Sequence, residues 1–120
     1  MGNLQAIQYI HWKKPEDLPD TDGKPSFNPQ FGFDKPRKKR VMVATEEEMK
    51  AAQLPLDKRD YCAHLLINFE SCRRTYWPFP VMCKPEKHMY LNCEHEDYIL
   101  RMKEYERERR LKAREARLAA

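Results

Sequence analysis

The 120-residue chain has few of the residues that build a large hydrophobic core. Leu, Ile, Val and Phe number 10, 4, 3 and 5, about 18% of the sequence, which is below the share at which a packed core of ordinary size is expected. The longest apolar stretches, such as 64–67, hold only a few residues, whereas a membrane-spanning helix needs about 18. The sequence therefore argues against a large enzyme domain and against a membrane-spanning protein.

Targeting signals are also sparse. Residues 1–36 contain no arginine, so an Arg-rich transit peptide is not expected, and the first residues lack the long apolar segment of a secretory signal. Gly2 follows Met1, as N-myristoylation requires, which makes it the candidate lipidation site. Ala6 departs from the usual acylation motif, which has Ser or Thr at that position.

Charged residues make up 35% of the chain, with a net charge of +4. Basic residues concentrate in 37–40 and in the tail 101–117. Such runs are found in nucleic-acid-binding proteins, but no aromatic-studded groove or nucleic-acid motif accompanies them. We therefore favour a solvated face or a contact with an acidic partner, and expect no nucleic acid; a nucleic-acid or ribosome-associated module ranks last among the hypotheses.

Residues 1–44 show no sustained hydrophobic period and are expected to form an extended arm. Five prolines and all three glycines of the chain fall in this segment, and proline disfavours helix at and before its own position. The arm also carries large apolar rings that a solvated linker would not need. They dock either on another protein or on this chain's own hairpin, and they are Tyr9, Trp12, Phe27, Phe31 and Phe33.

Three helices are predicted after the arm. Thr45 and Glu48 match a capping box, so a short helix is expected from Thr45 to about Gln53. A second helix over about 56–75 follows Pro55, and a turn rich in proline follows it. A third helix is expected from about Cys83 to about Arg117, because no Gly or Pro follows Pro85.

The spacing of the four cysteines indicates an antiparallel hairpin. Nine residues separate Cys62 from Cys72, and nine separate Cys83 from Cys93. Ten helical steps leave both members of a pair on one face, about 15 Å apart along the axis. A bond between them is therefore excluded, because disulfide Cα atoms lie about 4.4–6.8 Å apart. A crossed pairing needs parallel helices, so the nested pairs Cys62–Cys93 and Cys72–Cys83 remain.

Apolar side chains repeat at helical spacing around the cysteines. The second helix has a predicted core stripe, and the third has a matching one, in which Met82, Met89 and Leu100 accompany Cys93. The third helix has a second stripe on roughly the opposite side, which marks either a partner surface or the place where the arm lies. The core stripe of the second helix is Cys62, Leu65, Leu66, Phe69, Cys72 and Tyr76, and the additional stripe is Leu91, Tyr98, Met102 and Tyr105.

A metal site is the competing interpretation of the cysteines. Zinc ligands usually come in close pairs, and a nine-residue gap gives no local chelate. The sequence has no reactive, closely spaced cysteine motif and no Cys–His–carboxylate order, so catalysis by a cysteine is not expected. His64, His88 and His95 are expected at the hairpin surface or an interface. We therefore predict no catalytic residue, no cofactor and no metal ligand.

Cys62-x₉-Cys72 followed by Cys83-x₉-Cys93 resembles the twin Cys-x₉-Cys, or coiled-coil-helix-coiled-coil-helix (CHCH), family. Segments 31–33, 41–45, 56–64, 93–98 and 101–110 are similar to the beta subcomplex subunit 7 family of mitochondrial NADH:ubiquinone oxidoreductase (complex I). The resemblance covers roughly residues 27–112. It implies an all-α fold: a disulfide-stapled antiparallel helix hairpin with an extended N-terminal arm and a long C-terminal helix. The family subunit is also associated with myristoylation at its second residue.

The resemblance further implies a non-catalytic accessory subunit of complex I on the intermembrane-space face of the membrane arm, needed for assembly and stability. Its partners would be other membrane-arm subunits, the inner membrane through a peripheral contact, and the oxidative import machinery of the intermembrane space. The alternative is a soluble intermembrane-space CHCH metallochaperone or a redox or assembly factor. The expected parts are an arm (1–44), a short helix (45–55), a hairpin (56–100) and a charged helical extension (101–120).

Overall fold

The computed structural model describes residues 5, 8–9, 12–20 and 24–120. Across these residues every regular element is a helix or a 3₁₀ turn, as predicted. The chain divides into two compact units, one of Lys38–Ile99 and one of Met1–Arg37 with Leu100–Ala120. Within the described part, no helix is long and apolar enough to cross a membrane. The elements are η1 (Pro15–Asp17), α2 (Glu46–Ala51), η2 (Leu56–Lys58), α3 (Ala63–Thr75), η3 (Pro80–Cys83) and α4 (Lys84–Ala119).

The short helix α2 has the predicted capping box at its start. The Glu48 amide donates to the Thr45 hydroxyl, and the Glu48 carboxylate accepts from the Thr45 amide. At its end Gln53 adopts a left-handed conformation (φ 55°). The Leu54 amide donates to the Met49 carbonyl there, in a Schellman motif that also brings these two side chains together in the core.

The helix expected over 56–75 begins later than predicted. Leu56–Lys58 forms only a 3₁₀ turn, and α3 starts at Ala63. The Asp60 carboxylate accepts a hydrogen bond from the Cys62 amide at 3.0 Å. Short acidic side chains that bond to nearby amides in this way offer the backbone an alternative to helix, and this delays the start of α3.

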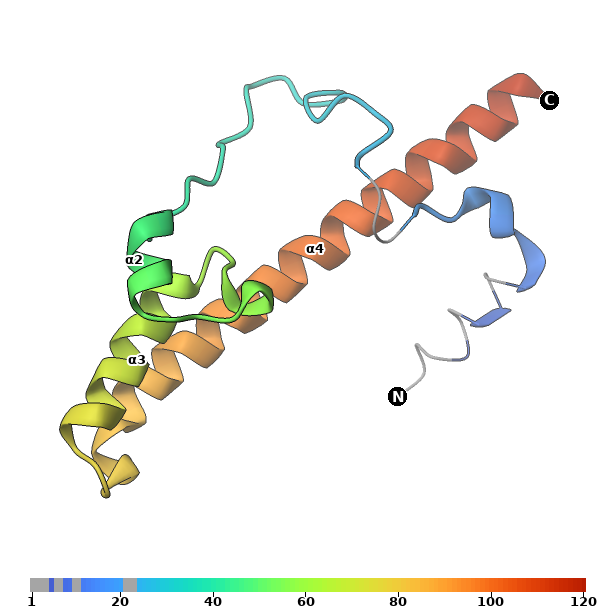
Figure 1. Ribbon diagram of the computed structural model, residues 1–120. Coiled ribbons are helices and arrows are strands. Elements are labelled where there is room, and N and C mark those ends of the chain that lie inside the picture. Colours follow the sequence, from blue (N-terminus) through green and yellow to red (C-terminus); the bar gives the residue numbers. More distant parts are fainter. Residues whose placement is uncertain (1–4, 6–7, 10–11, 21–23) are drawn as a thin grey trace. The chain divides into compact units, whose positions relative to one another are not determined.

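Helix α3 and the first half of α4 run antiparallel, joined by the turn around η3 (Figure 1). The third helix thus has the extent expected, with Pro85 accommodated in its first turn. Helix α4 is 36 residues long because its later part consists almost entirely of strong helix formers.

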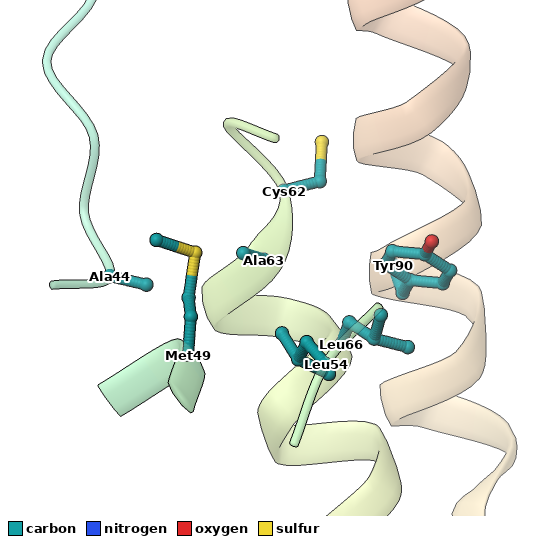
Figure 2. Packing of buried hydrophobic residues seen from close by; sticks show 7 residues of the cluster. All are labelled: Ala44, Met49, Leu54, Cys62, Ala63, Leu66 and Tyr90. Atoms are coloured by element: carbon teal, nitrogen blue, oxygen red, sulfur yellow. The ribbon is translucent and has the colours of Figure 1, made fainter. Parts of the chain in front are cut away.

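The core of the Lys38–Ile99 unit includes the segment before the hairpin. Ala44 and Met49 lie on one side of α3, Tyr90 of α4 lies on the other, and Leu54 belongs to the same cluster beside Leu66 (Figure 2). The predicted α3 stripe is buried at Cys62 and Leu66, with Leu65 and Phe69 packed beside them. Segment 44–54 therefore covers a face that a two-helix hairpin alone would leave exposed.

Four residues predicted for the core stripes are exposed instead: Tyr76, Met82, Met89 and Leu100. The residues that meet α3 from the other side of the hairpin are Cys83, at the end of η3, and Tyr90 and Cys93 of α4, which step by 7 and 3. Because Tyr90 occupies the interface, the neighbouring Met89 is turned away from it. Tyr76 and Met82 lie in the turn, beyond the helices that could cover them.

The second unit combines the described part of the arm with the end of α4. The arm is not uniformly extended, because Tyr9, Trp12 and Lys13 are helical and Pro15–Asp17 forms a 3₁₀ turn. Lys112 Nζ donates to the Leu18 carbonyl at 3.2 Å, and the Ser26 amide donates to the Glu108 carboxylate at 3.3 Å. The arm is thus bonded to the charged helical extension.

Candidate functional site

Two disulfides staple the hairpin at two levels. The structure joins Cys62 to Cys93 and Cys72 to Cys83, with a Cα–Cα distance of 5.9 Å in each pair. Cys62 and Cys83 are completely buried, so each bridge places one sulfur inside the packed region. All four cysteines are among the described residues, and none has a free thiol. The arrangement is a cross-link between two helices and offers no thiolate for chemistry.

An acidic pair lies beside the outer disulfide. Burial raises the pKa of the Glu94 carboxyl, and the adjacent Asp60 carboxyl, with an oxygen within 4.8 Å of it, raises this pKa further. Burial and the nearby Glu94 and Asp60 carboxylates raise the pKa of Tyr90 to about 12, so this phenol stays protonated beside Glu94. No local sequence pattern indicates this pair, because its members are 34 positions apart and come together only when Cys62 and Cys93 are joined.

Part of the basic run 37–40 is paired within the chain. Arg40 Nη1 lies 2.5 Å from Asp97 Oδ1, and its guanidinium lies 3.7 Å from the centre of the Tyr61 ring. This contact fixes the segment before α2 to the start of α3 and to α4, all within one unit. The basic run was expected either to be solvated or to contact an acidic partner. Arg40 contacts an acidic partner, and that partner, Asp97, is on its own chain.

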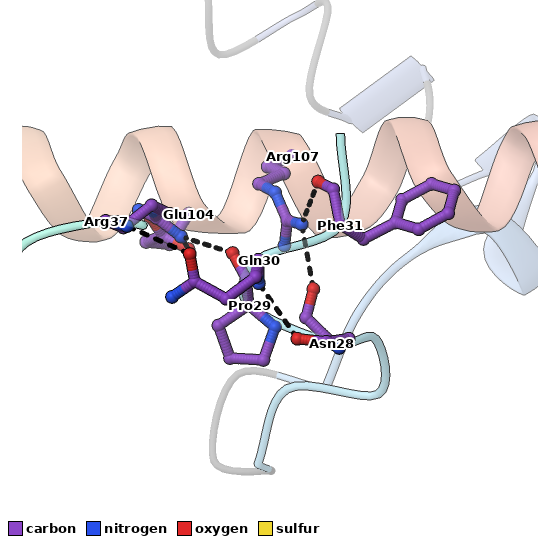
Figure 3. A network of polar contacts seen from close by, with 7 residues as sticks. All are labelled: Asn28, Pro29, Gln30, Phe31, Arg37, Glu104 and Arg107. Atoms are coloured by element: carbon purple, nitrogen blue, oxygen red, sulfur yellow. Dashed lines mark hydrogen bonds and ion pairs between the residues drawn. The ribbon is translucent and has the colours of Figure 1, made fainter. Parts of the chain in front are cut away.

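In the other unit, arginines hold the arm against the end of α4 (Figure 3). Arg107 Nη2 donates to the carbonyls of Asn28 and Phe31, at 3.0 and 2.9 Å. Arg37 pairs with Glu104 and donates to the Pro29 carbonyl at 3.2 Å. The basic tail thus binds the arm's backbone, a role that no local pattern in the sequence predicts.

The aromatic residues of the arm were expected to dock either on another protein or on this chain's own hairpin. The Phe33 ring lies 4.7 Å from the Arg37 guanidinium and 5.6 Å from that of Arg107, and Phe31 lies 5.6 Å from Arg114. These two rings therefore lie on their own chain, against the helical extension rather than the hairpin. Tyr9 and Trp12 are exposed, and Phe27 is half-buried.

The other candidate residues stay peripheral. His88 and His95 are exposed, and the His64 ring nitrogen lies 3.1 Å from the Tyr61 carbonyl oxygen. Gly2 lies outside the described residues, so its acylation stays a prediction. Two clusters bring metal-ligand types within 4.8 Å of one another. Each depends on disulfide sulfurs, which lack the thiolate charge that binds zinc; the clusters are Cys72, Cys83, Glu86 and Asp60, Cys62, Glu94.

Much apolar surface is left on the hairpin unit. In the second stripe of α4, Leu91 and Tyr98 are about half exposed. The turn between α3 and α4 exposes five more large apolar side chains within seven positions, which are Tyr76, Trp77, Phe79, Val81 and Met82. Exposed apolar surface of this extent marks a surface that contacts something else.

These features, a disulfide-stapled hairpin with no thiol and with large exposed apolar surfaces, agree with the comparisons with known proteins. A model of the family described as NADH-ubiquinone oxidoreductase B18 subunit (NDUFB7) matches residues 43–105, which hold all four cysteines and the whole core. The chain belongs to this family. The matched region includes the acidic pair and the Arg40 partner Asp97.

Curated members of the family from animals are similar over most of their length. The chain is 54% identical over 101 residues to NADH dehydrogenase (ubiquinone) 1 beta subcomplex subunit 7 of Mus musculus, covering 84% of this chain and 73% of the mouse protein. It is 54% identical over 117 residues to the Bos taurus protein of that name, covering 98% and 83%. The Caenorhabditis elegans protein of that name is 44% identical over 121 residues, covering 100% and 98%.

Proposed function

We propose that the chain is a non-catalytic accessory subunit of mitochondrial complex I that lies on the intermembrane-space side of the membrane arm and stabilises it. Membership of the B18 subunit family supports the assignment to the complex. The observation that carries the structural role is the pair of bridges between α3 and α4, at a Cα–Cα distance of 5.9 Å each. A cross-linked hairpin holds its exposed side chains in fixed positions, which suits a strut between larger proteins.

The proposed side of the membrane follows from the redox chemistry. Disulfides persist in oxidising compartments and are rare where glutathione keeps thiols reduced. The intermembrane space, with its oxidative import machinery, would supply both bridges to a chain of this kind. Proteinase treatment tests the location: the chain should resist digestion in intact mitochondria and be digested once the outer membrane is ruptured. Protection after rupture would contradict the location.

The structural role is tested by removing the chain. Cells that lack it should lose intact complex I on a native gel, and re-expression of the wild-type chain should restore the complex. The variant Cys72→Ala/Cys83→Ala, which lacks the inner bridge, should restore it only in part. Normal amounts of intact complex in the deleted cells would refute the proposal.

The alternative, a metallochaperone or redox factor, needs a reactive thiol. All four cysteines are bonded in the two disulfides, so none has a free thiol. Thiol titration of the native chain distinguishes the two. No reactive thiol is expected of the strut, and one or more per chain would favour the alternative.

A further inference from the structure

The turn between α3 and α4 forms an exposed apolar tip, which we call the hairpin tip and define as residues 76–82. Trp77 and Phe79 expose 78% and 68% of their surface, and the other large apolar side chains of the tip are also exposed. The turn lies at the very end of the hairpin, past the last turn of α3 (Figure 1). The inner disulfide Cys72–Cys83 closes the hairpin directly behind the tip and fixes its position.

Cations surround the hairpin tip. Residues 73–87 contain four basic residues and a single carboxylate, Glu86. Arg73 donates to Glu70 at 3.0 Å, which partly compensates its charge. Arg74, Lys84 and Lys87 are exposed on either side of the aromatic residues. Apolar rings at the end, with cations directly behind them, form the pattern that the interface of an anionic bilayer accommodates.

We propose that the hairpin tip inserts into the interfacial layer of an anionic lipid bilayer, with Trp77 and Phe79 among the upper acyl chains and Arg74 and Lys84 at the phosphates. A bilayer suits the tip better than a protein because the end of two helices offers on the order of a few hundred Å², whereas a stable protein interface takes about 800 Å² from each partner. Insertion of the hairpin tip about 5–10 Å into a bilayer needs no more apolar area than the end of the two helices offers. No described helix spans a membrane, so this contact is peripheral.

The chain provides its own spectroscopic test because it has two tryptophans, Trp12 in the arm and Trp77 in the tip. The oxidised full-length variant Trp12→Phe keeps only the tip reporter. With phosphatidylcholine–cardiolipin vesicles its emission should shift to the blue and be quenched by brominated acyl chains. The matched variant Trp77→Phe keeps only Trp12, which should show neither change. Tip fluorescence that stays unshifted and unquenched by the bromolipids would overturn the proposal.

Substitutions separate the apolar and the charged contributions. Trp77→Ser/Phe79→Ser should weaken binding to these vesicles at least about tenfold, since each ring loses its burial. The matched control Val41→Ser/Val43→Ser removes two other exposed apolar side chains of the same unit and should bind within about twofold of the wild type. Arg74→Gln should weaken binding about fivefold on anionic vesicles and not on pure phosphatidylcholine. Equal effects of tip and control variants would refute the assignment.

A measurement in the assembled complex decides between lipid and protein. A benzoylphenylalanine placed at position 79 should form adducts with phospholipid on irradiation of membranes. Attachment to another protein would overturn the proposal and make the tip a protein interface. The vesicle assays use the chain alone, so a negative result there would not contradict its proposed function in complex I. If instead the native-gel experiment contradicted that function, lipid binding of the chain could still be measured.

Discussion

Asp60 and Glu94 place two carboxyl groups side by side at the disulfide that joins Cys62 to Cys93, with an oxygen of each and the Cys62 sulfur all within 4.8 Å of one another. Asp60 also accepts the hydrogen bond from the Cys62 amide at the start of α3. The outer bridge therefore brings Asp60 beside Glu94, where the Asp60 carboxyl adds to the rise in the pKa of the Glu94 carboxyl. The chain tolerates this because Asp60 orders the backbone at the bridge, and because Tyr90 and Lys58 near Glu94 partly offset the rise in its pKa.

Glu94→Gln should stabilise the chain at pH 7. Burial raises the pKa of Glu94 in the folded state, so its ionisation costs stability as the pH rises from the unfolded pKa through the folded one. At low pH both states carry the protonated acid, and the variant should match the wild type. Thermal unfolding at pH 7 and pH 4 measures the difference. Glu96→Gln, at an exposed position on the same helix, should change nothing, and an equal gain from it would argue against the buried pair.

The outer bridge should contribute more than the inner one. In the chain-entropy model a closed loop of 31 residues is worth about 3.7 kcal/mol and one of 11 residues about 2.8 kcal/mol. Cys62→Ala/Cys93→Ala should therefore lower the free energy of unfolding more than Cys72→Ala/Cys83→Ala. Urea unfolding followed by circular dichroism gives both values. A larger loss from the inner pair would show that native packing, rather than loop closure, sets the contribution.

Gln53→Gly should raise the free energy of unfolding by about 0.5–1 kcal/mol. Gln53 has φ 55° at the end of α2, a conformation that glycine adopts without a Cβ clash. Gln53 is exposed, so its side chain contributes little packing. Gln53→Ala keeps the Cβ and serves as the control, which should give no gain. A stabilising alanine, or a neutral glycine, would contradict the argument from conformation.

The C-terminal part of α4 should weaken in acid. A hydrogen bond from Arg109, supported by Arg110, lowers the pKa of Glu106 to about 2. The stability that Glu106 contributes is complete above its unfolded pKa near 4.5, and is lost as the pH falls from there to about 2. Helicity of the wild type and Glu106→Gln should therefore differ at pH 7 and converge near pH 2. Parallel acid titrations would contradict a role for the ionised carboxylate.

The hairpin and its bridges could be predicted because they follow from local spacing. Helical periodicity places Cys62 and Cys72 on one face, and the proline-rich turn brings α4 back alongside α3. The predicted start of α3 was wrong because the Asp60 side chain accepts a hydrogen bond from the Cys62 amide and so competes with helix formation there. The spacing of residues does not reveal this competition. The contact of Arg107 with Phe31 spans 76 positions in a segment without period or cysteine, so no sequence signal predicts it.

The most direct test is a disulfide map of the chain taken from isolated complex I without reduction. Trypsin leaves Cys62 and Cys72 on one peptide, so a second cut after Glu70 by a glutamate-specific protease is needed. The chain should co-purify with the complex after mild detergent extraction. Peptide 60–70 should be bound to the Cys93 peptide, and peptide 71–73 to the Cys83 peptide. A chain absent from the complex, or cysteines joined in any other order, would contradict these predictions.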